Sequence, residues 1–141
     1  SKGIPNNAER PRFLIDKDTD GKPNLATKWC CTAKGPNQRW VILEFGDVVS
    51  ITKFMLSHGA TSTSNSFDKN MKGINTVEYE IYTSMDGVNW TKVVHHKNNT
   101  DNVTIDKLEE AVEAKYVKLN VINGGFDISA RIYDMRIYGS R

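Results

Sequence analysis

Long apolar runs are absent from this chain of 141 residues. A membrane-spanning helix needs about 20 consecutive, mostly apolar residues, so we expect no membrane span. Cysteine is also scarce, since the chain has only the adjacent pair Cys30 and Cys31. Neighbouring side chains of a strand point to opposite faces, so these two do not form an ordinary disulfide, and no second pair exists to build a zinc site. We expect two thiols, one buried and one exposed.

A large excess of charge of either sign is missing as well. The net charge is +2 and the pI is near 8.5, with lysine and arginine scattered along the chain. Proteins that bind nucleic acid usually carry a concentrated basic patch, so we expect no nucleic-acid partner. No signal-peptide pattern is visible and the first residue is Ser1. We therefore expect residues 1–141 to form one domain, either a monomeric module of a longer protein or a mature fragment.

Catalytic motifs are also lacking. The sequence contains no Gly-x-Ser-x-Gly, no His-Glu-x-x-His, no P-loop and no glycine pattern typical of dinucleotide binding. A glycosidase needs two carboxylates placed across a cleft, and no spacing singles out such a pair among the 17 acidic residues. These absences favour a binding protein over an enzyme.

The clearest positive pattern lies in residues 77–90. Apolar residues, among them Tyr79 and Ile81, alternate with polar residues, which is the period-two pattern of a half-buried strand. Gly87 then permits a turn, because glycine tolerates a positive φ, and Trp90 opens a returning strand. This segment predicts a β-hairpin.

Most of the remaining chain predicts further short strands separated by Gly, Asn, Asp and Ser, which is typical of a β-sandwich. The expected strands are Trp40–Phe45, Ile51–Ser57, Val77–Ser84, Trp90–His95, Asn102–Ile105, Lys115–Val121 and Arg131–Tyr138. Two brief segments, Arg10–Ile15 and Lys107–Ala111, look helical. Large aromatic residues dominate burial, so we expect Trp29, Trp40 and Trp90 to be packed in the core.

An aspartate-rich loop precedes these strands. Asp16, Asp18 and Asp20 alternate before Gly21. Calcium takes about six to eight oxygen ligands, and a loop of alternating aspartates can wrap them around one ion. An EF-hand is not expected, because Thr27 stands at the position of its bidentate glutamate. The alternative is an acidic surface loop that binds nothing.

Two aromatic residues lie in polar loop segments. Phe67 and Phe126 are surrounded by Ser, Asn, Gly and Asp, including Asp68, Asn70 and Asp127. Such a group suits a sugar, because a ring covers the apolar CH face of a pyranose while amides and carboxylates bind its hydroxyls. The alternative is that each ring plugs the end of the sandwich.

The hairpin also carries a resemblance. An alternating strand followed by Ser-x-Asp-Gly-x-x-Trp, at Ser84–Trp90, resembles the discoidin domain, also called the factor-five/factor-eight C-type domain. Its sugar-binding branch is family 32 of the carbohydrate-binding modules. The similarity extends from about Leu14 to Gly139 and implies an all-β, discoidin-like antiparallel β-sandwich with a structural calcium.

The resemblance implies where that calcium binds. Residues 14–16 and 27–29 resemble the two ends of the family's calcium loop, and residues 132–139 resemble its final strand, which supplies an acid. Lys17 replaces the usual glycine after the first aspartate, so Asp16 and Asp20 both remain candidates for the main carboxylate. The implied ligands are Asp16, Asp18, Asp20, Thr27 and Asp134.

The resemblance also implies a sugar site on loops at one end of the sandwich. Phe126 matches the ring that stacks on the sugar, His58 roughly matches a contact to hydroxyls, and Asn75 lies near a further contact. The expected ligand-binding residues are His58, Phe67, Asp68, Asn70, Asn75, Phe126 and Asp127. Galactose-binding relatives carry an arginine near His58, and this chain has none between Arg39 and Arg131. We therefore expect terminal N-acetylglucosamine or a related hexose.

The expected function is that of a non-catalytic module that targets a secreted glycoside hydrolase to host or mucosal glycans. The alternative is a discoidin-like adhesion or membrane-surface domain, whose relatives expose apolar side chains on the same loops. We expect no membrane partner, because the loops of this chain are mostly polar. An enzyme in its own right is a third, less favoured reading, because the main acidic cluster suits calcium.

Overall fold

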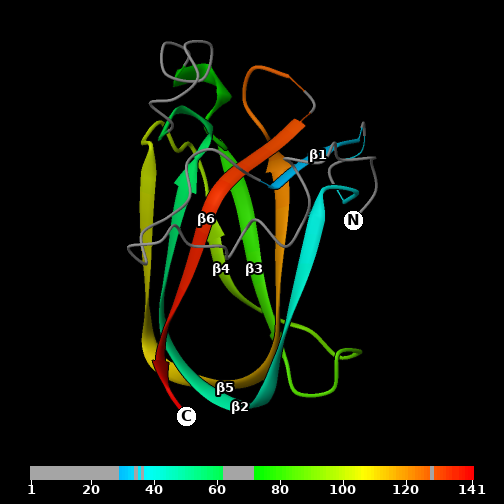
Figure 1. Ribbon diagram of the computed structural model, residues 1–141, viewed down its shortest axis with the longest axis vertical. Helices are drawn as coiled ribbons and strands as arrows, with labels where there is room; N and C mark the ends of the chain where they lie inside the picture. The colour runs from blue at the N-terminus through cyan, green and yellow to red at the C-terminus, as the bar shows by residue number, and fades with distance from the viewer. Residues whose placement is uncertain (1–28, 34, 36, 62–71, 128) are drawn as a thin grey trace, which may run out of the picture.

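The computed structural model describes residues 29–33, 35, 37–61, 72–127 and 129–141 (Figure 1). Several predicted features lie outside these residues. They are the helix Arg10–Ile15, the metal candidates Asp16, Asp18, Asp20 and Thr27, and the sugar-site candidates Phe67, Asp68 and Asn70.

The described chain is almost entirely β-structure. Its strands are β1 (Trp29–Thr32), β2 (Trp40–His58), β3 (Glu78–Ser84), β4 (Thr91–His96), β5 (Val103–Asn123) and β6 (Ser129–Ser140). Two 3₁₀ turns, η2 (Gly59–Thr61) and η3 (Lys72–Ile74), follow β2 and precede β3. All strand pairs are antiparallel, in the order β1-β6-β2-β5-β3-β4.

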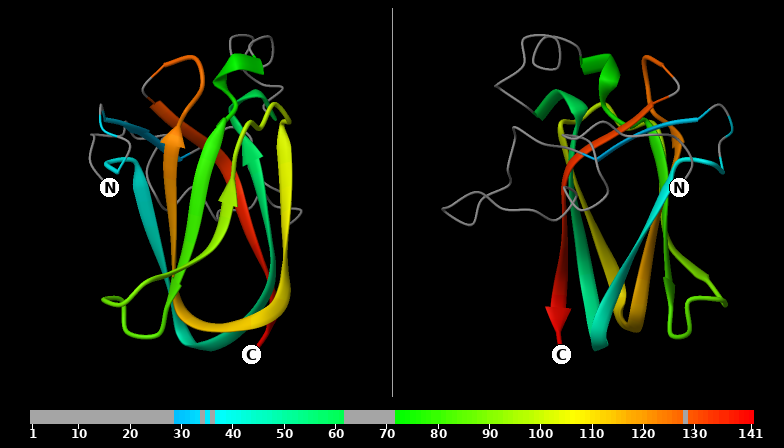
Figure 2. Two further views of the ribbon diagram at one scale, coloured as in Figure 1. Left: turned by 180° about the vertical axis from the view of Figure 1, so that it is seen from behind. Right: turned by 45° about the vertical axis from the view of Figure 1, so that its right-hand side comes forward.

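Two long, bent strands fold this sheet into two layers (Figure 2). β2 and β5 pair along most of their length, from Trp40 opposite Asn120 to Ser57 opposite Val103, with register shifts between Glu44 and Val49. The far half of β2 also pairs with β6, and the far half of β5 with β3. Because irregularities let strands bend sharply, both strands run through both layers. The predicted antiparallel β-sandwich is confirmed.

The core lies between the layers. Alternation places Tyr79 and Ile81 of β3 inside with no exposed surface, as the hairpin pattern predicts. Trp29 is also fully buried. Trp40 and Trp90 are only half-buried, contrary to expectation. In β2 the core position falls on Val41, so the alternation of a strand turns Trp40 to the outer face.

Two further expectations are wrong. Lys107–Ala111 is not helical but part of β5, where Lys107 pairs with Lys53. Its helix-forming residues are overridden by the ladder with β2, because propensity is a weaker effect than tertiary pairing. Cys30 and Cys31 are thiols that are both buried, because both faces of β1 are covered. Within the described residues, no helix is long and apolar enough to cross a membrane.

Candidate functional site

The loop between β5 and β6 presents an exposed aromatic ring. It lies at the end of the sandwich opposite the bends of β2 and β5, and is the orange loop of Figure 1. Phe126 is 63% exposed, although large aromatic side chains usually bury most of their surface. An aromatic ring left in water on a polar loop is available to a ligand.

The backbone that carries Phe126 is fixed by close contacts with η3. The Phe126 N–H donates to the Gly73 carbonyl at 2.6 Å. Gly125 has a φ of 94°, and a Cβ there would lie 2.1 Å from the Gly73 oxygen and 2.7 Å from the Asn75 oxygen. Only glycine fits such a position. The ring therefore stands on a loop that is clamped to its neighbour.

Asp127, the next residue, is held by an arginine. Arg131 Nη1 and Nη2 donate to the two carboxylate oxygens of Asp127 at 2.9 and 2.7 Å, and the Ser129 N–H donates to the same carboxylate at 2.8 Å. The guanidinium of Arg131 is the main cause that holds the pKa of Asp127 below its usual value. Arg131 is not among the residues predicted for this site, because a single arginine near the start of a strand forms no motif. Asp127 is thus a charged, oriented acceptor beside Phe126.

His58 and Asn75 lie behind this surface. Asn75 is 1% exposed and its side-chain oxygen accepts from the Ala60 N–H at 2.8 Å, while its amide nitrogen donates to the side-chain oxygen of Asn102 at 3.0 Å. It ties η2 to the segment before β5. His58 has no exposed surface. Both side chains support the loops in this structure, and neither reaches the surface where a sugar hydroxyl would lie.

His58 belongs to a buried polar cluster inside the sandwich. Its Nε2 shares a hydrogen bond of 2.9 Å with the Thr104 hydroxyl, which shares a second one of 2.8 Å with the Tyr79 hydroxyl. Burial, and then the nearby His96, lower the pKa of His58 to about 3. Burial and a hydrogen bond to Asp106 raise the pKa of Tyr79. The cluster is therefore neutral at His58 and serves packing more than chemistry.

Asp134 is the one predicted metal ligand among the described residues. Its side chain is 1% exposed in β6, and Arg136 Nε donates to one carboxylate oxygen at 2.9 Å. It lies two residues along β6 from Ile132, which pairs with Trp29, the first described residue of β1. A buried carboxylate is a hard oxygen donor of the kind that calcium prefers, so Asp134 fits the implied ion. Within the described ranges, no group of three or more His, Cys, Asp or Glu is placed to hold a metal.

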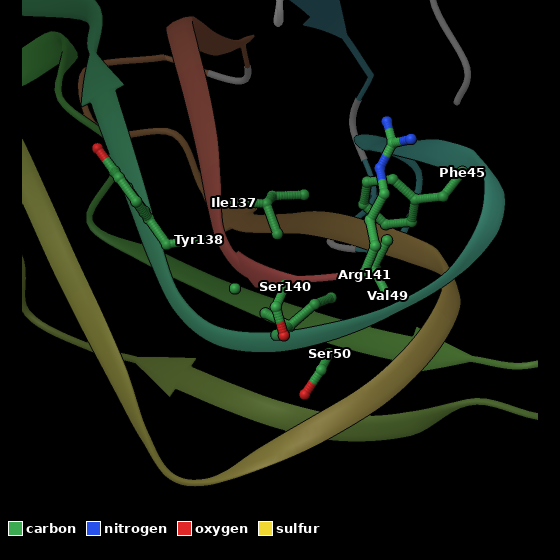
Figure 3. A pocket seen from close by; sticks show the side chains of 9 residues that line it. Phe45, Val49, Ser50, Ile137, Tyr138, Ser140 and Arg141 are labelled. Atoms are coloured by element: carbon green, nitrogen blue, oxygen red, sulfur yellow. The ribbon is translucent and has the colours of Figure 1, made fainter.

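A cavity of about 180 Å³ lies at the other end of the molecule (Figure 3). Phe45, Val49 and Ile137 line it where β2 bends beside the end of β6. None of the predicted ligand-binding residues lines it. Its lining mixes these apolar side chains with polar ones such as Ser140 and Arg141.

Comparisons with known proteins agree with this architecture. The family model of the F5/8 type C domain matches residues 5–132. No curated protein is significantly similar in sequence to this chain. The fold is similar to that of a family 32 module of a Clostridium perfringens family 89 glycoside hydrolase, solved with GalNAc-β-1,3-galactose. That pair has a TM-score of 0.75 and 23% identity, and the match covers 99% of this chain and 91% of the other.

Two further structures show the same fold. The family 32 carbohydrate-binding module of Streptococcus pneumoniae EndoD has a TM-score of 0.68 and 17% identity, over 85% of this chain and 82% of the other. A family 89 glycoside hydrolase from Clostridium perfringens, solved with PUGNAc, has a TM-score of 0.73 and 19% identity, over 100% of this chain and 14% of the enzyme. The fold is therefore one that occurs as a small part of a large enzyme. From its sequence match, this chain belongs to the F5/8 type C domain family.

Proposed function

We propose that this chain is a non-catalytic module that binds the terminal sugar of a glycan at the loops around Phe126. The observation that carries the proposal is the exposed ring of Phe126, held on a clamped loop next to an oriented carboxylate. A rigid ring loses little conformational entropy when a sugar stacks on it. Asp127 keeps lone pairs that accept from sugar hydroxyls, while its link to Arg131 fixes its direction.

N-acetylglucosamine or a related hexose is the proposed ligand. The chain has no arginine between Arg39 and Arg131. Arg39 donates to the carbonyls of Ala33, Val121 and Ile122, and Arg131 binds Asp127. Both guanidinium groups are thus engaged within the protein, which supports a sugar that does not need an arginine at an axial hydroxyl.

The test of this proposal is a glycan array followed by calorimetry. We expect the chain to bind glycans that end in N-acetylglucosamine with a Kd of roughly 0.1–1 mM, as is usual for one small site with few contacts. Galactose-terminated glycans should bind at least about fivefold more weakly, because about 1 kcal/mol of lost hydroxyl bonding changes Kd by that factor. Selective binding of galactosides would overturn the choice of sugar, and binding of no glycan would overturn the function.

The biological role that we propose follows from the fold's occurrence within glycoside hydrolases. The module would be monomeric and would belong to a secreted glycoside hydrolase that acts on host or mucosal glycans. One weak site gives modest affinity, but tethering to an enzyme raises the local concentration of substrate at the catalytic domain. The module itself contributes no reaction.

We also propose a structural calcium ion that involves Asp134. A ligand that binds only the folded chain, present at about 100 times its Kd, stabilises the fold by about 2.7 kcal/mol. Adding calcium to a chelator-treated sample should therefore raise Tm by several degrees. In Asp134→Asn the increase should vanish, whereas the exposed Asp47→Asn on the bend of β2 should retain it. Calorimetry on the unaltered chain is the decisive control, and a calcium titration without heat of binding would contradict the proposal.

A further inference from the structure

A second hollow lies on the outer face of the layer formed by β2, β5 and β3, and we call it the outer-face pocket. Its volume is about 180 Å³. The residues that line it are Asn37, Trp40, Tyr82, Lys118 and Asn120. It shares no residue with the loop of Phe126. Two aromatic rings, two amides and an ammonium thus surround one small space on the protein surface.

Strand alternation explains why these side chains gather there. Val117 and Leu119 of β5 point into the core with at most 1% exposure, so Lys118 and Asn120 point outward. Trp40 pairs directly with Asn120 across the ladder between β2 and β5, and Tyr82 pairs with Lys118 across the ladder between β3 and β5. Four of the five lining residues therefore stand on strands of this layer, and the fifth, Asn37, lies in the turn that leads into β2.

Asn120 has an unmet acceptor in this pocket. Its side chain belongs to a residue that is 5% exposed, and its amide nitrogen donates to the Asn37 side-chain oxygen at 3.4 Å. Its own side-chain oxygen has no hydrogen-bond partner among the described residues. Buried polar atoms almost always have a partner, so such an atom marks a place where a donor is expected. A hydroxyl of a bound ligand would supply that donor.

Lys118 gives the pocket a positive charge. Its ammonium lies 4.9 Å from the centre of the Tyr82 ring and 4.6 Å from the centre of the Trp90 ring. Among the ion pairs of the described residues, none involves Lys118, whereas the neighbouring Lys92 is paired with Glu80 at 2.6 Å. Stacking on rings leaves the charge of an ammonium uncompensated. The cation therefore remains available to an anionic group of a ligand.

We propose that the outer-face pocket is a second saccharide site, selective for a pyranose that carries a carboxylate, such as a hexuronic acid. The Trp40 indole, on which no other ring or cation of the described residues is stacked, covers the apolar face of the sugar ring. The Asn120 side-chain oxygen accepts from a ring hydroxyl. Lys118 pairs with the carboxylate. This assignment goes beyond the proposed function and does not depend on the site at Phe126.

The two sites together would make the module bivalent. Asn120 lies three residues before Asn123, the last residue of β5, and the loop that carries Phe126 follows β5 directly. Both sites therefore lie toward the same end of the sandwich, one on its tip and one on its side. A glycan that combines a neutral terminal residue with an acidic one would gain affinity from simultaneous contact, without any new interaction at either site.

The experiment compares two ligands that differ in one group, methyl β-glucuronide and methyl β-glucoside. Titrations across the millimolar range are followed by the NMR signals of the Trp40 indole N–H and the Asn120 side-chain amide. We expect the glucuronide to shift both signals and to bind about three- to fivefold more tightly, the factor expected for one partly exposed ion pair. Raising the salt concentration should reduce that preference, because exposed charges are screened.

Variants decide whether Lys118 causes the preference. Lys118→Gln should bind both ligands equally, while Lys107→Gln, an exposed lysine of the same strand, should keep the preference. The binding of N-acetylglucosamine should not change in either variant. The proposal is overturned if neither ligand shifts the signals of Trp40 and Asn120, if the shifts occur only in the loop of Phe126, or if Lys118→Gln keeps the preference. Spectra of each variant without ligand verify the fold.

Discussion

Replacement Phe126→Ala should weaken the binding of terminal N-acetylglucosamine by at least about tenfold, the effect expected for a central aromatic contact of a small site. The ring is 63% exposed, so its removal leaves no cavity in the core and the free energy of unfolding should hardly change. Loss of binding without loss of stability is the signature of a contact residue. Calorimetry and thermal unfolding measure the two quantities on the same sample.

A matched control tests whether any exposed apolar side chain would have the same effect. Val88 is 77% exposed on the loop between β3 and β4, at the end of the sandwich opposite Phe126 (Figure 2). Val88→Ala should bind as the unaltered chain does, and Phe126→Trp should restore most of the affinity lost in Phe126→Ala, because indole also stacks on sugars. Equal affinity of Phe126→Ala and the unaltered chain would place the sugar elsewhere.

The position of the ring should matter as much as its presence. Gly125→Ala keeps Phe126 but adds a Cβ that would lie 2.1 Å from the Gly73 oxygen, at a φ of 94° that side chains resist. The loop must then leave η3. We expect an affinity close to that of Phe126→Ala, with the core strands still folded. This comparison separates a preorganised ring from one that is merely exposed.

Acid should destabilise the module through His58. Burial lowers the pKa of this imidazole to about 3 in the folded chain, against 6.5 for an unperturbed histidine. Between these two values the unfolded chain binds a proton that the folded chain refuses, so stability falls as the pH drops. One such proton changes the free energy of unfolding by about 1.4 kcal/mol per pH unit, and by about 4–5 kcal/mol over the whole window. That is comparable to the whole stability of a modest domain.

Urea unfolding at a series of pH values between 7 and 4 measures this loss. His58→Gln removes the titrating group but keeps an amide that can bond to Thr104. Its free energy of unfolding should therefore change less with pH, by up to about 1.4 kcal/mol less per pH unit, which is the contribution of one proton. His95→Gln is the control, because His95 is exposed on β4 and paired with Glu78 at 2.7 Å. Parallel pH profiles of the unaltered chain and His58→Gln would show that His58 does not govern acid stability.

The fold was largely predictable because alternation is a strong signal where one face of a strand is buried. It placed Tyr79 and Ile81 inside correctly. Alternation does not show whether the outer face of a strand is also covered. The burial of Glu80 on the outer face of β3 was therefore not predicted, although this residue is 6% exposed and bound to Lys92 and the Tyr82 hydroxyl. Trp40 was expected in the core because large aromatic residues usually bury most of their surface, whereas the alternation of β2 turns it to the outer face. The continuity of β5 through Lys107–Ala111 depends on pairing with β2, which local propensity does not contain.

The candidate site was predictable only in part. Phe126 and Asp127 stood out because an aromatic ring in a polar loop is unusual. His58 was expected to contact a sugar because it roughly matches a family position, whereas its burial depends on partners such as Thr104, which lies 46 residues away in the sequence. Arg131 was missed because a single arginine at the start of a strand carries no pattern. Pairings of this kind are fixed by how distant segments meet, and a single sequence does not encode them as a local motif.

The continuity of β2 and β5 through both layers has a consequence for how the module opens. In a sandwich made of separate sheets, one layer can loosen while the other stays intact. Here each layer is built from half of β2 and half of β5. Loss of the pairing between Ser57 and Val103 in one layer should therefore also destabilise the pairing between Trp40 and Asn120 in the other. Cooperative units of unfolding follow such shared elements. The loop that carries Phe126 and the outer-face pocket around Trp40 should therefore keep their structure together until the whole module unfolds.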